Sequence, residues 1–317
     1  AGLANHYFKG AYYPKGGGQI IADKLAEAVE AAGGGVYLRR GIAEVMVEGG
    51  RAVGVRTEAR RGESFDVRAR AVISGADLRH TLLDLVGPEH LPSRWVKRVD
   101  SFEMGGAIFL TCLGIEADMS ELGMGACNYW QFDTTDVEQV YADQARGKLD
   151  PVGAYITCAT LKDPSTQHAP EGVSNVEVMT LLSGKAEHWG VTPEAMRAGR
   201  YRQDPEYRDR KAMVEQALVD RLDRFFPGSA ERIVFRESAT PVTHTRYTRA
   251  MDGTGYGLAA TPAQFLKKRP GTRGPIDGLY LCGASTRAGH GVVGAMRSGY
   301  LAAWRVGDTL GVQALPS

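Results

Sequence analysis

The chain has few cysteines, little net charge and no long apolar run, and each shortage excludes a class of protein. Its 4 cysteines, at positions 112, 127, 158 and 282, lie too far apart for a C-x-x-C redox pair or a zinc knuckle. We therefore expect a reduced cytoplasmic protein without a metal site. The 38 basic and 37 acidic side chains leave a formal charge of +1, which gives no field that favours nucleic acid. No apolar run approaches the ~18 residues of a membrane span, and no signal-peptide pattern opens the chain.

The motifs of hydrolases and metalloenzymes are missing as well. The sequence contains no Ser-His-Asp order, no H-E-x-x-H and no paired acids that demand a hydrolytic function. Chemistry carried by a bound cofactor needs none of these groups, because the protein then supplies only binding, orientation and electrostatics.

Glycine is abundant and clustered. The 40 glycines gather at 16–18, 33–35, 49–50, 105–106 and in a turn near the end of the chain. This distribution is typical of many short strands and tight turns. The length of 317 residues is enough for two ordinary domains, each with a core of its own.

The first third of the chain alternates between helical and strand patterns. Apolar residues at spacings of three and four predict a helix over 18–32, and the glycines 33–35 end it. The segments expected next are a strand at Val36–Arg39, a hairpin of Ile42–Glu48 and Ala52–Glu58 across Gly49-Gly50, a strand at Phe65–Arg70, a short buried strand at Ala71–Ser74 that runs into Gly75-Ala76-Asp77, and a helix over Leu78–Val86. Ligands of α/β sheets sit at such strand ends.

The middle of the chain has a different pattern of predicted strands and helices. Strand patterns at Gly106–Leu113, Gly153–Leu161, Val173–Leu182 and Arg232–Glu237, with a charged helix over Asp204–Phe226, predict a mainly antiparallel sheet with helices on one side. The fold class is therefore α/β, with α+β character in the middle. We expect one discontinuous domain from residues 1–77 and 275–317, and a second domain from 78–274.

The segment from Gly278 to Leu310 is the most informative. It predicts a buried strand over Leu279–Cys282 and then a helix whose start carries Gly289, Gly291 and Gly294 in the spacing G-x-G-x-x-G. Free N–H groups and the positive end of the helix dipole would suit an anionic or electron-rich cofactor edge. The alternative is that the glycines only let the helix pack closely. No strand and acidic residue follow the helix, so the segment is not the first unit of a Rossmann fold.

Several collinear stretches together resemble a family. They are 6–25 (HYFKGAYYPKGGGQIIADKL), 41–56 (GIAEVMVEGGRAVGVR), 69–77 (ARAVISGAD), 160–172 (TLKDPSTQHAPEG), 239–247 (ATPVTHTRY) and 278–299 (GLYLCGASTRAGHGVVGAMRSG). The chain is similar to the phytoene desaturase, carotenoid isomerase and retinol saturase group of amine-oxidase-like flavoproteins. That resemblance implies bound FAD and hydride transfer to or from an apolar polyene or related lipid. Such proteins begin with a βαβ unit that binds the ADP half of FAD, and residues 1–40 contain none. We therefore expect a C-terminal part whose N-terminal FAD-binding segment lies elsewhere in the same gene or on a separate chain.

The resemblance also assigns cofactor contacts. It places Ile42 against the adenine, Gly75 and Ala76 beside the pyrophosphate, and two further groups near the flavin: Gly283, Ala284 and Ser285 after the last strand, and Gly291, Val292 and Gly294 at the start of the last helix. Residues of these kinds also occur in sheets that bind nothing.

Polar candidates accompany these contacts. His290 and Arg287 are the candidates for a catalytic role near the flavin, although a histidine in a turn often bonds only to backbone. By resemblance, Tyr12, Tyr13 and Lys15 lie at the junction of the cofactor and substrate domains. Their alternative is a packed aromatic pair beside a solvated lysine.

Three smaller assignments complete the set. Arg246 and Tyr247 would line the substrate channel by family analogy. The basic, aromatic segment 94–98 could touch an anionic bilayer as a peripheral membrane contact, or form a solvated helix face with one buried tryptophan. Asp163-Pro164 and Ala169–Gly172 are interpreted as turns.

Two other functions stay open beside the redox flavoprotein. A related two-domain fold without a cofactor fingerprint would serve as a non-catalytic carrier of prenylated or lipid cargo, or as an assembly module. An amine oxidase would share the flavin architecture, but the C-terminal turn offers Arg, Ala, Gly and His where an aromatic cage would be expected.

Overall fold

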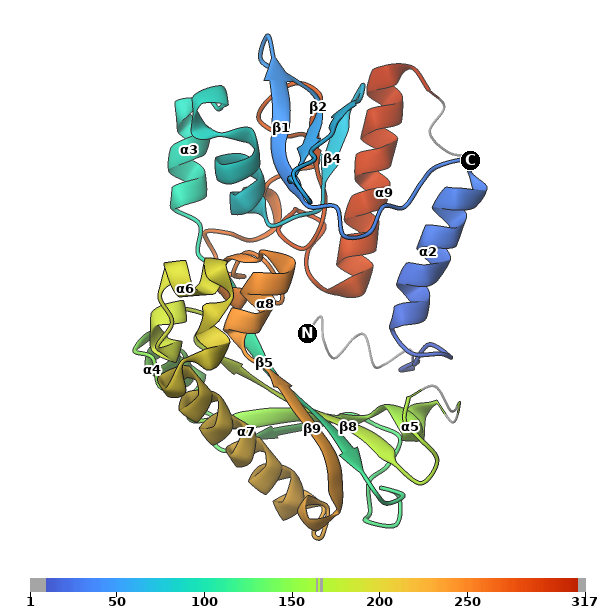
Figure 1. The fold of residues 1–317 in the computed structure, drawn as a ribbon, viewed down its shortest axis with the longest axis vertical. Helices are drawn as coiled ribbons and strands as arrows, with labels where there is room; N and C mark the ends of the chain where they lie inside the picture. Colours follow the sequence, from blue (N-terminus) through green and yellow to red (C-terminus); the bar gives the residue numbers. More distant parts are fainter. Residues whose placement is uncertain (1–9, 164, 166–167, 313–317) are drawn as a thin grey trace. The chain divides into compact units, whose positions relative to one another are not determined.

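The computed structural model describes residues 10–163, 165 and 168–312, which form two compact units (Figure 1). The first unit comprises the described residues up to 38 together with 109–181 and 205–239; the second comprises 39–108, 182–204 and the chain from 240 onward. Each unit is therefore assembled from segments far apart in the sequence. The expected cofactor domain (1–77 and 275–317) and substrate domain (78–274) are defined by what they would bind, so this division stays a prediction.

The first unit is built around a five-stranded sheet of order β6-β7-β8-β5-β9. Its strands are β5 (Ala107–Ile115), β6 (Tyr129–Phe132), β7 (Gly153–Cys158), β8 (Ser174–Leu182) and β9 (Ile233–Ala239). The pairs β6–β7, β7–β8 and β5–β9 are antiparallel, which agrees with the antiparallel sheet expected for the middle of the chain. One boundary was wrong. The chain leaves β7 at Cys158, and Ala159–Lys162 forms the short helix α5 where the sequence predicted three more strand residues.

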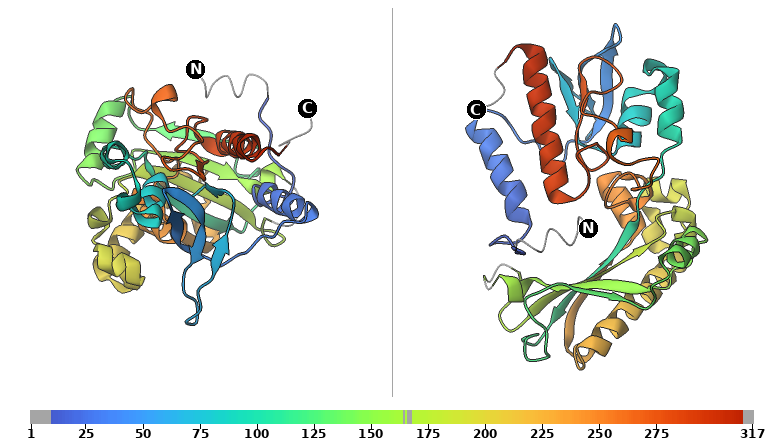
Figure 2. Two further views of the ribbon diagram at one scale, coloured as in Figure 1. Left: turned by 90° about the horizontal axis from the view of Figure 1, so that it is seen from above. Right: turned by 180° about the vertical axis from the view of Figure 1, so that it is seen from behind.

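The long helix α7 (Pro205–Phe225) packs along this sheet (Figures 1 and 2). Its buried residues recur at three and four positions, among them Val214, Leu218 and Leu222, so one apolar stripe lies inward. Arg221 on the same helix is buried as well, and its guanidinium donates to both carboxylate oxygens of Asp133, at 2.9 and 2.6 Å. This buried cation is therefore neutralised within its own unit.

The helix α2 (Gln19–Ala31) occupies the region where the apolar spacing predicts it. It ends as expected, because Gly33 has a φ of +81° and the Gly34 N–H donates to the Val29 carbonyl at 2.9 Å. The strand predicted for Val36–Arg39 is absent. Tyr37 and Leu38 are about four-fifths exposed and Arg39 has a φ of +57°, a conformation that cannot continue a strand.

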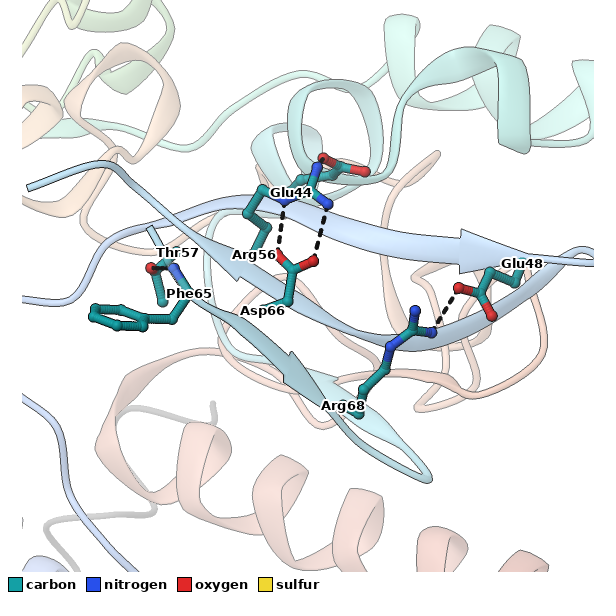
Figure 3. A network of polar contacts seen from close by, with 7 residues as sticks. All are labelled: Glu44, Glu48, Arg56, Thr57, Phe65, Asp66 and Arg68. Atoms are coloured by element: carbon teal, nitrogen blue, oxygen red, sulfur yellow. Dashed lines mark hydrogen bonds and ion pairs between the residues drawn. The ribbon is translucent and has the colours of Figure 1, made fainter. Parts of the chain in front are cut away.

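In the second unit, β1 (Ile42–Glu48), β2 (Arg51–Thr57) and β3 (Asp66–Arg68) form the predicted antiparallel meander. Gly49 and Gly50 both have positive φ, as a two-residue hairpin loop requires. Figure 3 shows ion pairs across its strands: Arg56 bonds Asp66 through two nitrogens, at 2.8 and 3.1 Å, and also reaches Glu44.

The same unit contains the strand pair that positions the candidate site. β4 (Val72–Ser74) and β10 (Leu279–Leu281) are parallel neighbours. The helix α9 (Gly291–Leu310) lies on one side of the strands, and η1 (His80–Val86) with α3 (Ser93–Asp100) lies on the other (Figures 1 and 2). The predicted helix over 78–86 is thus present, with π geometry from His80 on. One buried cluster joins the strands of this unit to η1 and α3: Val45, Ala52, Leu78, Leu82, Leu85, Val86, Leu91, Val99, Leu258, Leu279 and Leu281.

Short helices fill the connections. They are η2 (Pro88–His90), α4 (Val137–Ala145), η3 (Ala186–Trp189), α6 (Pro193–Ala198), η4 (Arg200–Gln203), η5 (Ala230–Arg232), α8 (Pro241–Thr248), η6 (Met251–Gly253) and η7 (Leu266–Lys268). The basic segment 94–98 is part of α3, where Trp95 packs partly against the core and the Arg98 guanidinium lies 5.0 Å from its ring centre. Within the described ranges, no helix combines the length and apolarity needed to cross a bilayer.

Candidate functional site

The candidate site is a cleft at the carboxyl ends of two parallel strands in the second unit. Leu281 of β10 pairs with Ser74 of β4, so the two chains leave the sheet side by side. The residues that follow, Gly75–Asp77 and Cys282–Ser285, form two walls of a cleft of about 290 Å³. Residues between His244 and Gly257 form the third wall. A volume at the lower end of ligand pockets fits part of a dinucleotide cofactor, at the strand ends where the sequence predicted a ligand.

Backbone forms much of these walls. A Cβ on Gly75 would lie 3.2 Å from the Cys282 sulfur, and a Cβ on Gly257 would lie 2.4 Å from the Ser285 hydroxyl. Gly257 and Gly283 also have positive φ, +70° and +94°. Only glycine takes these conformations readily, and at Gly75 and Gly257 the missing side chain lets two walls of the cleft lie close together. The predicted contacts Gly75, Ala76, Gly283, Ala284 and Ser285 all line this cleft.

Asp77 holds two of the walls together. Its Oδ1 accepts from the N–H groups of Arg79 and His80, at 2.9 and 3.0 Å, and so starts the helix that leads into η1. Its Oδ2 accepts from the Met251 N–H at 3.3 Å. Both carboxylate oxygens therefore serve the architecture of the cleft.

His244 contributes a polar atom without a partner. The helix α8 begins in a capping box between Thr240 and Thr243, and His244 and Thr248, four residues apart on one helix face, both line the cleft. The Nε2 atom of His244 is buried and has no hydrogen-bond partner among the described residues. Burial lowers the pKa of this imidazole, which favours its neutral form. Sequence reasoning missed His244, although helical spacing over 241–248 would have grouped it with Thr248.

Arg246 and Tyr247, chosen for the substrate channel, lie on the same helix outside the cleft lining. Tyr247 is 69% exposed, and its hydroxyl accepts from Arg202 Nη2 at 2.7 Å. The Arg246 guanidinium lies 5.5 Å from the Tyr247 ring centre. Their role toward a substrate stays a prediction.

The amino end of α9 combines open and packed glycines. Gly289 and Gly291 have φ of +97° and +75°, and a Cβ on either would meet nothing within 4 Å. A Cβ on Gly294 would instead lie 2.6 Å from the Gly289 carbonyl oxygen, so this glycine lets the helix pack on its own entry turn. No side chain caps the helix, and Val292 is 60% exposed. Close packing therefore explains Gly294, while Gly289 and Gly291 leave the helix start accessible.

His290, the N-cap residue of α9, has both ring nitrogens engaged. Its Nδ1 lies 2.9 Å from the Tyr256 carbonyl oxygen, and its Nε2 lies 3.2 Å from Arg269 Nη1. Arg287 is exposed; its N–H donates to the Pro270 carbonyl and its guanidinium to the Lys267 carbonyl, at 2.8 and 3.3 Å. Neither candidate for a catalytic role lines the cleft.

Ile42 begins β1 opposite Thr57 and does not line the cleft either. The adenine contact assigned to it by resemblance stays a prediction. Its half-buried position at a strand start also agrees with an ordinary place in the meander.

The first unit has a polar cluster of its own, centred on Asp163. This carboxylate accepts from the Gly16 N–H at 2.5 Å, His168 Nε2 at 2.9 Å and the Ser165 hydroxyl at 3.0 Å. The hydrogen bond from His168, followed by that from the Gly16 amide, holds the pKa of Asp163 well below its usual range. The sequence had suggested only turn chemistry here, with Pro164 outside the described residues.

The aromatic residues near Gly16 are not a packed pair. Tyr12 is 91% exposed, whereas the Tyr13 ring lies 6.2 Å from the ring of His168 and 5.6 Å from Lys162 Nζ. Lys15 is exposed, as its solvated alternative predicted. Burial, followed by the charges of Glu177 and Asp163, raises the pKa of Tyr13. Tyr13 thus belongs to the Asp163 cluster, and Tyr12 does not.

The sequence is similar to flavin-dependent proteins over nearly its whole length. A family model described as flavin containing amine oxidoreductase matches residues 3–307. The prolycopene isomerase of Daucus carota is 29% identical over 319 residues, which cover 98% of this chain and 46% of the relative. The all-trans-retinol 13,14-reductase of Danio rerio is 25% identical over 293 residues, covering 89% of this chain and 47% of the relative. The chain thus spans about half the length of the curated relatives it matches.

Solved structures support the fold. An oxidoreductase from Methanosarcina mazei matches with a TM-score of 0.55 and 18% identity, over 90% of this chain and 53% of its own. A putrescine oxidase bound to putrescine matches with a TM-score of 0.52 and 14% identity, over 93% of this chain and 53% of its own. At these identities the likeness concerns the fold alone.

Proposed function

Because this chain belongs to the flavin containing amine oxidoreductase family, we propose that it forms the C-terminal part of an FAD-dependent oxidoreductase that acts on C–C bonds of an apolar polyene. The observation that carries the proposal is the cleft where the ends of β4 and β10 meet. In α/β sheets such strand ends hold nucleotide cofactors. The flavin, when bound, supplies the hydride chemistry, so the chain itself needs no nucleophile.

The residues of the cleft fit part of such a cofactor. Gly75, Gly257 and Gly283 line the cleft without side chains of their own, which leaves the volume between its walls to a phosphate or ribityl group. The buried Nε2 of His244 lacks a partner that a hydroxyl or ring heteroatom of the cofactor would supply. The start of α9 offers amide N–H groups and a positive dipole end. In this arrangement the protein binds and orients the cofactor.

We propose that the rest of the FAD site is formed by a further polypeptide segment, which completes the cleft described above. The curated relatives are about twice as long as the part they share with this chain. β4 forms a ladder with β10 alone among the described strands. α9 also exposes a stripe of large apolar residues, from 46% to 76%: Val292, Val293, Met296, Tyr300 and Trp304. An open strand edge beside an exposed apolar stripe is suited to a further strand and helix, as an N-terminal FAD-binding segment would provide.

The polyene substrate rests on the names of the relatives. Prolycopene and all-trans-retinol, after which two of them are named, are both apolar polyenes. The proposed substrate contacts stay those of the sequence: Tyr12, Tyr13, Lys15, Arg246 and Tyr247. Peripheral contact with a membrane, from which such a substrate could be drawn, is proposed through α3.

The test is flavin loading. The chain is expressed alone and together with the segment that precedes it in the gene, and bound FAD is measured from its visible absorbance and stoichiometry. We expect stoichiometric yellow protein in the second case, and bleaching of the flavin under anaerobic conditions when a dihydro-polyene is added. A folded, colourless complex that binds polyenes tightly would instead establish the non-catalytic carrier, and rapid reduction by simple amines would establish an amine oxidase.

A pair of glycine variants separates the cleft from general folding. Gly283→Ala places a methyl group at a φ of +94° in the cleft wall, and Gly62→Ala does the same at +86° in a hairpin turn, where nothing lies within 4 Å. Both carry similar backbone strain. Only Gly283→Ala should weaken FAD binding; equal effects would show that the cleft is not the cofactor site.

A further inference from the structure

One charge in the second unit is buried without a counter-charge. Arg269 is 2% exposed, yet no carboxylate among the described residues lies within ion-pair distance of its guanidinium. Its Nη1 donates to the Ala284 carbonyl at 3.1 Å, its Nη2 donates to the Leu258 carbonyl, and its Nε has no partner. The buried Arg221 of the first unit also leaves its Nε without a hydrogen-bond partner among the described residues, but its two terminal nitrogens donate to the Asp133 carboxylate, so its charge is compensated. Burial lowers the pKa of Arg269, but a guanidinium keeps its proton throughout the physiological range.

Arg269 also fixes the state of His290. An arginine can only donate, so His290 Nε2, 3.2 Å from Arg269 Nη1, must accept. His290 is then neutral and carries its proton on Nδ1, which donates to the Tyr256 carbonyl at 2.9 Å. The N-cap residue of α9 is thereby held between Arg269 and the 256–258 segment. His290 cannot serve as a proton donor without breaking this arrangement.

The charge lies directly behind the cleft. Ala284, whose carbonyl accepts from Arg269, lines one wall, and Gly257, between Tyr256 and Leu258, lines another. The uncapped amino end of α9 adds its own partial positive charge beside His290. A buried, uncompensated cation behind walls of glycine and alanine complements a negative charge in the cleft.

We propose that Arg269 is a positioning residue for the flavin site: it fixes the start of α9 through His290, and its uncompensated charge favours the anionic reduced form of the bound flavin over the neutral oxidised form. This inference rests on the proposed function. Two-electron reduction with one proton leaves the isoalloxazine with a net negative charge, so a nearby cation should bind the reduced form more tightly.

The test is the midpoint potential of the flavin-loaded protein, measured against reference dyes, together with the pH at which the reduced flavin loses its proton. Arg269→Met should lower the affinity for reduced relative to oxidised flavin on the order of tenfold, which is roughly 30 mV for a two-electron couple. It should also raise the pH of that proton loss. Arg269→Lys keeps the charge without the fork and should retain most of the wild-type potential. Arg273→Met removes an exposed guanidinium four residues along the same segment and is the matched control.

The outcomes decide the inference separately from the proposed function. A wild-type potential in flavin-loaded Arg269→Met, or a shift in Arg269→Lys as large as that of the methionine variant, would overturn the role of the charge. If Arg269→Met does not fold, the lysine variant decides: a potential within the range of Arg273→Met supports the role, and a larger shift contradicts it. If the wild-type protein with its preceding segment binds no flavin at all, the proposed function fails instead.

Discussion

The strand-end cleft of the second unit and the Asp163 cluster of the first are built in opposite ways. Glycine and alanine backbone forms much of the cleft, and buried polar atoms lack partners among the described residues both in its lining, at His244, and behind it, at Arg269. In the Asp163 cluster, the chain satisfies its own polar groups: a single carboxylate accepts from the Gly16 N–H and from the side chains of Ser165 and His168. Unpartnered buried polar groups are costly and persist where a ligand completes them. The difference supports the proposal that the cleft takes the ligand, whereas the cluster acts as a clamp that ties Gly16 to the loop of Asp163.

The two regions also differ in what holds them in place. The cleft depends on the core under β4 and β10, and on α8, which carries His244. The clamp depends on one loop that follows β7 and on the segment before α2. Substitutions in the core of the second unit should therefore damage its site, whereas the clamp should respond to the state of one carboxylate.

The largest effect is expected in the cores. Leu82→Ala in the second unit and Leu218→Ala in the first both remove a fully buried side chain, and each should lower the free energy of unfolding by about 2–5 kcal/mol. Hydrogen exchange measured by mass spectrometry should show faster exchange first in β1 and β4 for Leu82→Ala, and in β7 and β8 for Leu218→Ala. Uniform acceleration across both units in either variant would show that the two cores unfold as one.

A smaller effect is expected at the start of α8. Thr240→Ala removes the side chain that accepts from the Thr243 N–H, which should cost about 1 kcal/mol and fray the helix that positions His244. Flavin affinity should fall with it, while Thr240→Ser, which keeps the hydroxyl, should bind as the wild type does. Equal flavin affinity in both variants would mean that α8 does not support the cleft.

The local elements could be predicted from the sequence wherever periodicity and glycine agreed. The hairpin at Gly49-Gly50, the end of α2 and the buried strand before the C-terminal glycines follow from near-neighbour physics. The strand predicted at 36–39 was wrong. Apolar residues in a sequence do not show whether the fold places a core beside them, and Tyr37 and Leu38 stay exposed.

The residues of the candidate site also fall into those that the sequence could predict and those that it could not. Gly75, Ala76 and Gly283–Ser285 could be predicted because they follow apolar strands, and their backbone conformation is a property of their own sequence. Arg269 and His244 could not be, since what distinguishes them is the absence of a partner, which only the fold reveals. Asp163 could not be predicted for a different reason: it has a partner, but that partner, Gly16, lies 147 residues away in the sequence.

A pH titration should distinguish the clamp from the cleft. The folded-state pKa of Asp163 is lowered, so the unfolded chain takes up the proton first as the pH falls. The stabilisation is then complete above the ordinary pKa of about 3.9 and is lost as the pH drops toward the lower, folded value. The amide resonance of Gly16 should move only below about pH 4 in the wild type, and Asp163→Asn should abolish that movement. Glu171→Gln, which neutralises an exposed carboxylate of the same loop, should leave it unchanged; a Gly16 titration near neutral pH would assign the clamp to another group.

The smallest effect is expected on the meander, where side-chain pairs are most conspicuous. Arg56 bonds both Asp66 and Glu44, but all three side chains are more than two-fifths exposed (Figure 3). Water and salt screen such pairs, so Arg56→Gln should leave the thermal midpoint within experimental error. Arg68→Gln, which removes the neighbouring pair with Glu48, should behave alike. A clear loss of stability in the variant, reproduced by high salt in the wild type, would contradict this. It would show that side-chain pairing fixes the register of the meander, and not the glycine turn with the buried face of β1 and β2. The second unit would then depend on side-chain pairs as the Asp163 clamp does.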